Sequence, residues 1–277
     1  MPTDKAVSDH YLHGDLLNAI RTSLEKAGRT VESVTLADLA PVDEFHIGGR
    51  QATERFLSQL NFLEDDHVLD VGCGLGGAAR YVADKYNIQV TGIDLTPEYV
   101  ETGKVLCTWV RLDKQISLHA GSALDMPFQD RTFDGGYMMH VGMNIENKAR
   151  LFAEISRVLR PGAPFGVYDV MRTRDGELAY PVPWAADGST SSLGTPEEYR
   201  QALDSAGFMI SRETNRREFA LEFFGQLRAR LEAEGGPPPL GLHTLMKEST
   251  ALKIGNLVDN LAAGYVAPVE IIARKEW

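Results

Sequence analysis

A glycine-rich turn between an apolar segment and a helical segment constrains this fold more than any other feature of the sequence. Segment 67–71 has the length and apolar character of a buried strand, and 78–86 has the periodicity of a helix. Between them, residues 72–77 read Gly-Cys-Gly-Leu-Gly-Gly. Glycines there let the backbone turn sharply and approach a ligand closely, and the following helix presents unpaired N–H groups. We therefore expect a strand–turn–helix unit whose turn faces a ligand.

Strands and helices alternate after this turn. The expected elements are, in order, strand 88–93, helix 97–111, strand 115–119, strand 133–139, helix 148–159 and strand 165–170. Such alternation is typical of βαβ units around a mostly parallel sheet. The chain is therefore predicted to be an α/β protein.

The two ends of the chain add helical segments to this core. The expected elements are helices 16–27 and 51–60 at the start, then helix 196–206, strand 208–213, helix 219–233, a Gly-Pro connector 235–239, helix 242–261 and strand 266–273. We predict a helical N-terminal extension over residues 1–60 and an α/β domain over 61–277. A helical cap is expected within that domain, near 172–194 and 219–262, where it would roof the site and set specificity.

The composition argues against several classes of protein. The 277-residue chain has a formal net charge of −11, which disfavours nucleic acid as a partner because phosphate contacts require a surplus of Lys and Arg. It has no apolar run of about 18 residues, so no membrane span is expected. The chain has only two cysteines, and its N-terminus lacks a signal-peptide pattern, so we expect a cytoplasmic protein. Its histidines lack the spacing of metal ligands, so no bound metal is expected. No pattern in the sequence indicates an oligomeric state.

Two carboxylates accompany the glycine turn. Asp70 lies two residues before Gly72, and Asp94 ends the second strand, where it can accept hydrogen bonds from both ribose hydroxyls of a nucleoside. The turn also matches the GxGxxG dinucleotide pattern, so a nicotinamide-dependent oxidoreductase is one interpretation. Three features favour a methyl donor instead. The first is Asp70, which would lie near the cationic aminoacyl group of such a donor. The second is the segment of about 65 mostly helical residues that precedes the first strand. The third is the loop Gly-Ser-Ala-Leu-Asp-Met-Pro-Phe at 121–128.

Together these features resemble the class I S-adenosylmethionine-dependent methyltransferases. The likeness spans roughly residues 45–213 and rests on Asp70-x-Gly72-x-Gly74-x-Gly76, Asp94 and the loop 121–128. It implies a Rossmann-like fold with a mostly parallel seven-stranded sheet whose last strand is antiparallel. It also implies that the chain binds S-adenosyl-L-methionine and transfers the methyl group to a small-molecule acceptor.

The resemblance assigns donor contacts residue by residue. The cofactor-binding residues that it implies are Asp70, Gly72, Gly74, Asp94, Leu95, Ser122, Ala123 and Leu124. Asp94 would hold the ribose, and Ser122 with the neighbouring backbone would hold the adenine. Many members of the family have Asp where this chain has Ser122, and a hydroxyl accepts a hydrogen bond less strongly than a carboxylate. Asp125 is therefore the alternative adenine partner.

Two stretches resemble a narrower group, the sarcosine/dimethylglycine N-methyltransferases, which are themselves similar to small-molecule methyltransferases of natural-product pathways. The first is Asp-Glu-Phe-His-x-Gly-Gly at 43–49. The second runs from Tyr-Pro-x-Pro-Trp-Ala at 180–185 through Ser-Thr-Ser at 189–191 to Thr-Pro-Glu at 195–197. The first expectation is therefore methylation of the nitrogen of an amine or amino acid such as a glycine derivative. The second is C- or O-methylation of a metabolite. A non-catalytic protein that kept the donor fold is the third hypothesis.

The candidate catalytic residues are two histidines. Methyl transfer depends mainly on positioning, and a base is needed only if the acceptor carries a proton that must leave early. His140 follows the fourth strand at the carboxyl edge of the expected sheet, and His46 lies in the Gly-rich loop before the core. Trp184 could face an amine cation, and Arg50 and Arg172 could hold a substrate carboxylate.

Overall fold

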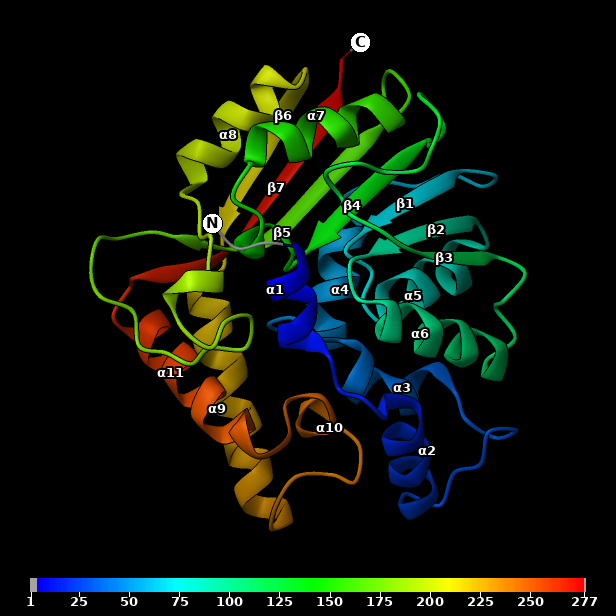
Figure 1. Cartoon of the computed structure of the whole chain (residues 1–277), viewed down its shortest axis with the longest axis vertical. Helices are drawn as coiled ribbons and strands as arrows, with labels where there is room; N and C mark the ends of the chain where they lie inside the picture. The colour runs from blue at the N-terminus through cyan, green and yellow to red at the C-terminus, as the bar shows by residue number, and fades with distance from the viewer. Residues whose placement is uncertain (1–3, 277) are drawn as a thin grey trace.

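The computed structural model describes residues 4–276, which form a seven-stranded sheet with helices on both faces (Figure 1). The strand order is β3-β2-β1-β4-β5-β7-β6. The strands are β1 (His67–Val71), β2 (Gln89–Asp94), β3 (Ile116–Ala120), β4 (Gly135–Met139), β5 (Pro164–Arg172), β6 (Phe208–Asn215) and β7 (Val266–Lys275). Strand β7 pairs antiparallel with β5 and β6, and the other pairings are parallel. The predicted α/β sheet with an antiparallel last strand is confirmed.

The strand order reverses beside β1. This strand pairs with β2 on one side and with β4 on the other, so the chain leaves β1 and β4 toward opposite sides of the sheet. The loops that follow two such strands diverge and leave a crevice at the carboxyl edge. The glycine turn follows β1 and His140 follows β4. The topology therefore brings both to the same crevice.

Two layers of helices cover the sheet. One layer contains α4 (Gly49–Leu57), α5 (Gly77–Tyr86) and α6 (Pro97–Trp109), and the other contains α7 (Lys148–Val158) and α8 (Pro196–Ser205). Helix α7 shows why such segments are helical, because its apolar side chains recur at helical spacing and are fully buried: Leu151, Phe152, Ile155 and Val158. Burial of one apolar stripe per helix forms the core on each face of the sheet.

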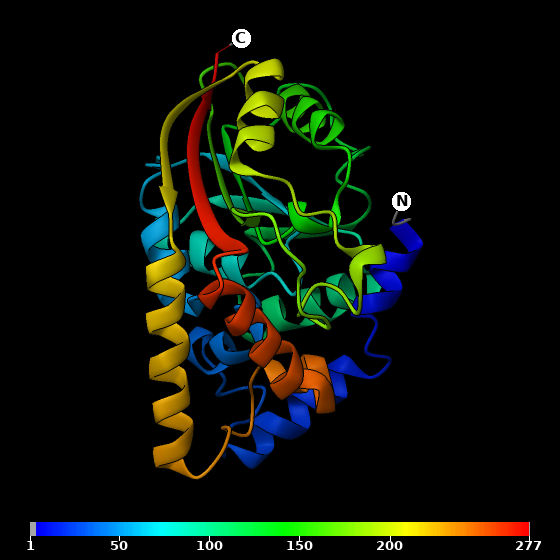
Figure 2. The ribbon, with the colours of Figure 1, turned by 90° about the vertical axis from the view of Figure 1, so that its left-hand side faces the viewer.

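The later N-terminal helices and the cap meet at one end of the molecule, whereas the first N-terminal helix lies near the centre of the view in Figure 1 (Figures 1 and 2). The first group is α1 (Asp4–Tyr11), α2 (Leu16–Lys26) and α3 (Leu36–Asp43), and the second is α9 (Arg217–Glu234), α10 (Leu242–Met246) and α11 (Thr250–Ala262). Helix α10 contacts both α2 and α3. The sequence did not predict α1, a short helix without a buried residue.

Several predicted element boundaries are wrong. The single helix expected over 242–261 is divided, because Lys247 adopts a left-handed backbone (φ 54°) and starts a short 3₁₀ turn (Lys247–Ser249) between α10 and α11. The strand expected from residue 133 begins at Gly135, because Phe133 forms only an isolated bridge with Leu159. The helix expected at 51–60 spans 49–57. The division of the chain at residue 60 stays a prediction.

Candidate functional site

The glycine turn brings backbone atoms into close contact with the loop that follows β4. Gly72 has a left-handed backbone (φ 72°), and a Cβ atom there would lie 2.2 Å from a methyl carbon of Val141. Any side chain would therefore collide with this loop as well as strain the backbone. Gly76, also left-handed, directly precedes α5. The turn thus leaves its own backbone, rather than side chains, facing the crevice.

Asp94, at the end of β2, is held by two backbone amides. The Gly74 N–H donates to Oδ2 at 2.8 Å, and the Thr96 N–H donates to Oδ1 at 2.9 Å. Burial raises the pKa of this carboxyl, and these two amides oppose the rise. Each carboxylate oxygen has a second lone pair, so the group can still accept two hydrogen bonds from a diol. The glycine turn and Asp94 therefore act as one rigid unit.

Asp70, at the carboxyl end of β1, has an unpaired oxygen. Its Oδ2 atom is buried and forms no hydrogen bond within the described part of the chain. Burial raises the pKa of Asp70 to about 8, the neighbouring Tyr137 hydroxyl opposes the rise, and the negative charges of Asp94 and Glu44 add to it. An orphaned buried carboxylate is costly without a cation or donor beside it. The chemistry of the site therefore fits a ligand that brings an ammonium group to Asp70.

The loop after β3 supplies the third part of the predicted donor site. Ser122, Ala123 and Leu124 line the same cavity as the glycine turn, whereas Asp125 is exposed and is absent from the cavity wall. The Ser122 hydroxyl oxygen accepts a hydrogen bond from the Leu124 N–H at 3.3 Å. The geometry therefore favours Ser122 over Asp125 as the side chain beside a bound adenine.

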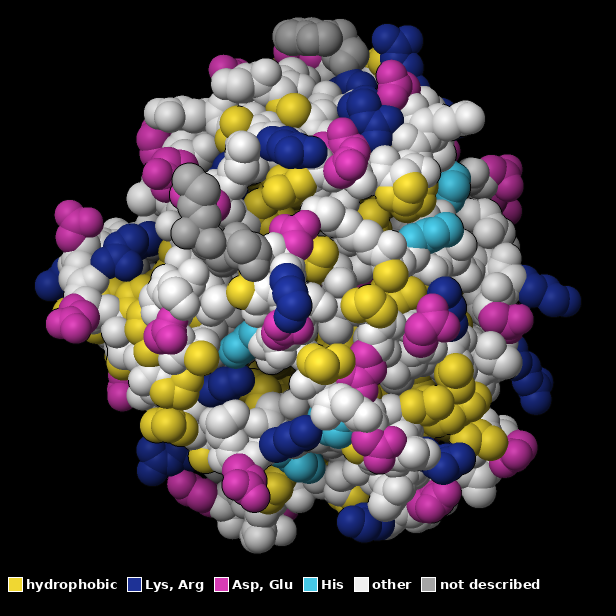
Figure 3. All heavy atoms as spheres, in the orientation of Figure 1, with side chains coloured by type: hydrophobic (Ala, Val, Ile, Leu, Met, Phe, Trp, Pro, Cys, Tyr) yellow, Lys and Arg dark blue, Asp and Glu magenta, His cyan; other side chains and the backbone are white. Residues whose placement is uncertain are grey.

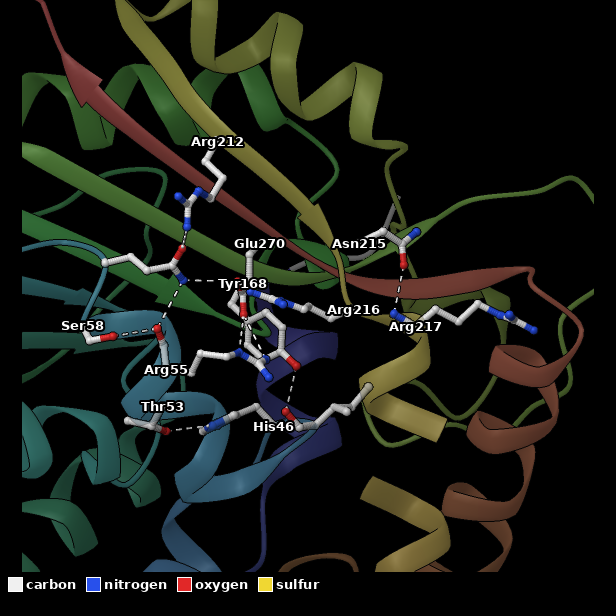
Figure 4. Close-up of polar contacts among 12 residues, drawn as sticks. His46, Thr53, Arg55, Ser58, Tyr168, Arg212, Asn215, Arg216, Arg217 and Glu270 are labelled. Carbon is white, nitrogen blue, oxygen red and sulfur yellow. Dashed lines mark hydrogen bonds and ion pairs between the residues drawn. The ribbon is translucent and has the colours of Figure 1, made fainter. Parts of the chain in front are cut away.

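His46 lies in a buried polar network (Figure 4). Its Nε2 atom is 3.0 Å from Thr53 Oγ1, 3.2 Å from the Gly49 carbonyl oxygen and 3.4 Å from Glu44 Oε2. The Thr53 hydroxyl donates to Glu44 Oε2 at 2.6 Å, and Arg50 forms an ion pair with the other carboxylate oxygen at 2.8 Å. Burial lowers the pKa of His46, and the nearby Glu44 charge opposes this.

His140, the first residue after β4, uses both ring nitrogens in contacts with the backbone. Its Nδ1 atom is 3.2 Å from the Tyr168 carbonyl oxygen, and its Nε2 accepts a hydrogen bond from the Ile47 N–H at 3.3 Å. Its left-handed backbone (φ 56°) is uncommon for a residue with a side chain. Burial lowers the pKa of His140 to about 3, and the neighbouring His46 adds to the effect. The ring is therefore neutral and fixes the loop that carries His46.

Two further contacts hold the loop over residues 43–50 against the sheet. Arg80, completely buried in α5, forms a 2.6 Å ion pair with Asp43. The Tyr168 hydroxyl, from β5, donates to the Ile47 carbonyl oxygen at 2.9 Å (Figure 4). These contacts come from elements far apart in the sequence, so the position of His46 depends on the complete fold.

One large cavity unites these groups. It has a volume of about 1440 Å³, and its wall contains all of the residues predicted to bind the cofactor together with His46 and His140. Opposite them, the cap contributes apolar side chains: Phe223, Phe224 and Leu227 from α9, and Ile254 and Leu257 from α11. The pocket is large beside the roughly 300–1,000 Å³ of typical ligand sites. It can hold a donor and a second, bulky molecule together.

The other candidates for acceptor binding have separate positions. Trp184 lines the cavity, and its indole N–H donates to Ser191 Oγ at 3.0 Å. Arg50 also lines it, but its guanidinium is paired with Glu44 and lies 5.0 Å from the centre of the Tyr81 ring. Arg172 is absent from the cavity wall and donates to a backbone carbonyl of the loop after β5. Neither arginine presents an unengaged cation to a carboxylate in the cavity.

Sequence reasoning missed three residues of the site. Glu44 and Thr53 complete the network around His46, and the Tyr11 hydroxyl, from α1, donates to Asn144 at 2.9 Å across the cavity. Glu44 lies in a stretch that the sequence singled out, but its spacing from His46 is not that of a known motif. Thr53 and Tyr11 have no pattern from which these contacts follow.

The visible face and the described side chains bear on nucleic-acid, metal and membrane binding. On the face in Figure 3, acidic and basic side chains are mixed and form no broad basic patch. Across residues 4–276, no group of three or more His, Cys, Asp or Glu side chains could hold a metal ion. The helices among these residues are also too short or too polar to cross a membrane.

The matching family model and the curated relatives agree on one family, and the solved structures share its fold. A family model described as "Methyltransferase domain" matches residues 69–166. Sarcosine/dimethylglycine N-methyltransferase of Halorhodospira halochloris is 30% identical over 68% of this chain and 67% of that protein. The crystal structure of the [4+2]-cyclase SpnF has a TM-score of 0.72 and 23% identity, with 99% of this chain and 97% of that chain covered.

A second solved structure was obtained with ligands bound. Geranyl diphosphate C-methyltransferase from Streptomyces coelicolor A3(2), in complex with Mg²⁺, geranyl diphosphate and S-adenosyl-L-homocysteine, has a TM-score of 0.66 and 19% identity over 80% of this chain and 78% of that chain. Matches to several other curated relatives are shorter and cover only 26% to 35% of those proteins.

Proposed function

This chain belongs to the class I S-adenosylmethionine-dependent methyltransferases, and from that premise we propose that it methylates a bulky, mostly apolar small molecule. The observation that carries the proposal is the cavity of about 1440 Å³, whose wall combines polar groups suited to the donor with a cluster of apolar side chains from α9 and α11, beside charged cap residues such as Arg230. When bound, the donor supplies an activated methyl group on a sulfonium. The protein's task is then to orient the acceptor toward that carbon and to exclude water.

The residues present fit this donor. Asp94 offers two oxygens to the ribose hydroxyls, and the orphaned Asp70 oxygen offers a partner for the ammonium of the aminoacyl group. Ser122 and the backbone N–H groups of Ala123 and Leu124 border the adenine end. The glycine turn supports close approach, because Gly72 has no room for a side chain. These contacts are part of the proposal.

The walls of the cavity favour a large acceptor over a glycine derivative. A glycine derivative would need a cation for its carboxylate: Arg50 is paired with Glu44 and Arg172 lies outside the cavity, although Arg230 of α9 lines the cap wall. Phe224, Ile254 and their apolar neighbours would instead bury hydrocarbon surface, at roughly 25 cal/mol per Å² removed from water. The methyltransferase function is therefore proposed for a hydrophobic acceptor, and the glycine-derivative expectation is the less supported one.

The test uses purified protein and a panel of acceptors of different chemistry. Calorimetric titration with S-adenosyl-L-homocysteine should show binding at micromolar concentrations. Mass spectrometry should then show gain of one methylene unit on polycyclic or prenylated acceptors, and much slower gain on sarcosine or dimethylglycine. An unchanged acceptor mass with a new retention time would indicate isomerisation instead, and a change of two hydrogens would indicate hydride transfer. Turnover of sarcosine alone would refute the acceptor class.

A matched pair of variants tests the role of the cap. Ile254 lines the cavity, whereas Leu252, on the same helix, is 58% exposed and absent from the cavity wall. Ile254→Gln should raise KM for an apolar acceptor about tenfold or more and leave binding of S-adenosyl-L-homocysteine unchanged, because a polar group would face hydrocarbon. Leu252→Gln should change neither value. Equal effects of the two substitutions would contradict acceptor binding beneath α11.

A further inference from the structure

We infer that His46 is the general base of this site, that its basic atom is Nδ1, and that Thr53 and Glu44 position it through the opposite ring nitrogen. The inference rests on the proposed function, because a base matters only where an acceptor must lose a proton. It adds the acceptor chemistry, a neutral hydroxyl of phenolic or enolic type. Its physical basis is the hydrogen-bonded network around His46 (Figure 4).

The neighbours of His46 Nε2 determine which nitrogen holds the proton. The Gly49 carbonyl oxygen, 3.2 Å away, and the Glu44 carboxylate, 3.4 Å away, can only accept hydrogen bonds. The Thr53 hydroxyl gives its own proton to Glu44 at 2.6 Å, so its oxygen accepts from Nε2 at 3.0 Å. Three acceptors therefore surround Nε2, and this nitrogen carries the ring proton. The hydrogen-bond network assigns the tautomer.

The second nitrogen, Nδ1, is left with an unshared lone pair. It forms no hydrogen bond to any described residue, and His46 is part of the cavity wall. Burial lowers the pKa of His46, so the ring is neutral near pH 7 and can accept a proton. The resulting imidazolium would be stabilised through Thr53 by the negative charge of Glu44. A catalytic histidine usually has one ring nitrogen oriented by a carboxylate, while its other nitrogen faces the substrate.

His140 does not meet this requirement. Its Nδ1 lies 3.2 Å from a carbonyl oxygen and must donate, while its Nε2 lone pair accepts the Ile47 N–H at 3.3 Å. To act as a base it would first have to release the loop that carries His46. The two histidines therefore hold opposite tautomers, and we assign His140 to positioning.

The reaction balances with these groups alone on the protein side. The acceptor O–H proton moves to His46 Nδ1 as the oxygen lone pair forms the new O–CH₃ bond. The carbon–sulfur bond breaks with its electron pair on sulfur, which becomes a neutral thioether. His46 leaves the step as an imidazolium and later returns its proton to water. A neutral hydroxyl suits this site better than a cationic amine, because Glu44 is already engaged by Thr53 and Arg50.

The tautomers can be tested without a substrate. In long-range ¹H–¹⁵N spectra of histidine-labelled full-length protein, His46 should be protonated at Nε2 and His140 at Nδ1, with the variants His46→Gln and His140→Asn assigning the signals. Other groups that face His46 are Glu44 in its own loop, Arg50 on α4 and Tyr168 on β5. Thr53→Val should mix the His46 tautomers, whereas Thr53→Ser should preserve the single Nε2-protonated form. Protonation of His46 at Nδ1 in the wild type would overturn the inference.

A pair of acceptor probes tests the catalytic role. At pH 8 with S-adenosyl-L-methionine, 2-naphthol must lose its proton during the reaction, whereas 4-nitrophenol is already largely ionised in water. His46→Gln should lower kcat for 2-naphthol about 100-fold or more, the usual scale of general base catalysis, and lower kcat for 4-nitrophenol less than tenfold. Thr53→Val should show the same pattern more weakly, with rescue by Thr53→Ser. Equal losses on both probes would refute the base. If the wild-type protein does not bind S-adenosyl-L-homocysteine at all, the proposed function is refuted instead.

Discussion

The buried carboxyl of Asp70 should couple donor binding to proton release. Burial raises the pKa of Asp70 from an ordinary 3.8 to about 8, so the native protein without donor holds this group protonated at pH 7. An ammonium beside the unpaired Oδ2 would favour the ionised form. Binding near pH 6.5 should therefore release about one proton. The dissociation constant should fall about tenfold per pH unit up to pH 8 and level off above it.

The same shift sets the sign of a stability effect. Between about pH 4 and pH 8 the native carboxyl keeps a proton that the unfolded chain loses, so this group lowers the free energy of unfolding as pH rises. The slope is at most about 1.4 kcal/mol per pH unit, and a shift of about four units amounts to roughly 5–6 kcal/mol over the whole range. In Asp70→Asn the side chain is neutral at every pH, so this position no longer lowers the free energy of unfolding as the pH rises. The variant should therefore be clearly more stable than the wild type at pH 9, and the difference should shrink toward zero as the pH falls to about 4.

The assay is calorimetry with S-adenosyl-L-homocysteine in phosphate and Tris buffers at equal pH. The difference in apparent enthalpy gives the number of protons released. Wild-type protein should release about one at pH 6.5 and almost none at pH 9. Asp70→Asn should bind more weakly at pH 8 and release none at either pH. Absence of proton release from the wild type, or the same pH dependence in Asp70→Asn, would refute the role of this carboxyl.

Three further substitutions test the structure around the site. Gly72→Ala should abolish donor binding and lower the melting temperature, because the added Cβ would lie 2.2 Å from Val141. The double variant Gly72→Ala/Val141→Ala should regain part of the lost stability. Asp43→Asn should cost about 3–5 kcal/mol in urea unfolding by leaving Arg80 as an unpaired buried charge. Tyr11→Phe should cost about 0.5–1.5 kcal/mol and speed hydrogen exchange in α1, because it removes the bond from α1 to the loop after β4. Unchanged exchange would contradict a role of this bond in holding α1 against the loop after β4.

Local patterns in the sequence were sufficient for the sheet and for the position of the predicted donor-binding residues in the wall of one cavity. A strand such as β1 is a short apolar run, and the spacing of Asp70, Gly72 and Asp94 is a property of two consecutive strand–helix units. Parallel strands place their carboxyl ends at one edge, so these residues had to come together once the alternation was recognised. The split of α10 from α11 was not predictable in this way, because the left-handed Lys247 belongs to a residue type that usually continues a helix.

The acceptor side was decided only by tertiary structure. His46 and His140 were both found in the sequence, and the partners of His46, Gly49 and Thr53, lie within seven residues of it. The contacts of His140 instead depend on the Ile47 N–H and the Tyr168 carbonyl, which the fold brings together from separate elements. A hydrogen bond between distant segments has no periodicity and leaves no trace in composition. Likewise, the large apolar cavity depends on how α9 and α11 pack over the sheet edge. The sequence by itself determined that the residues predicted to bind the donor would lie together at one edge of the sheet. Packing over long sequence distances determined the apolar wall of the cavity and the contacts of His140.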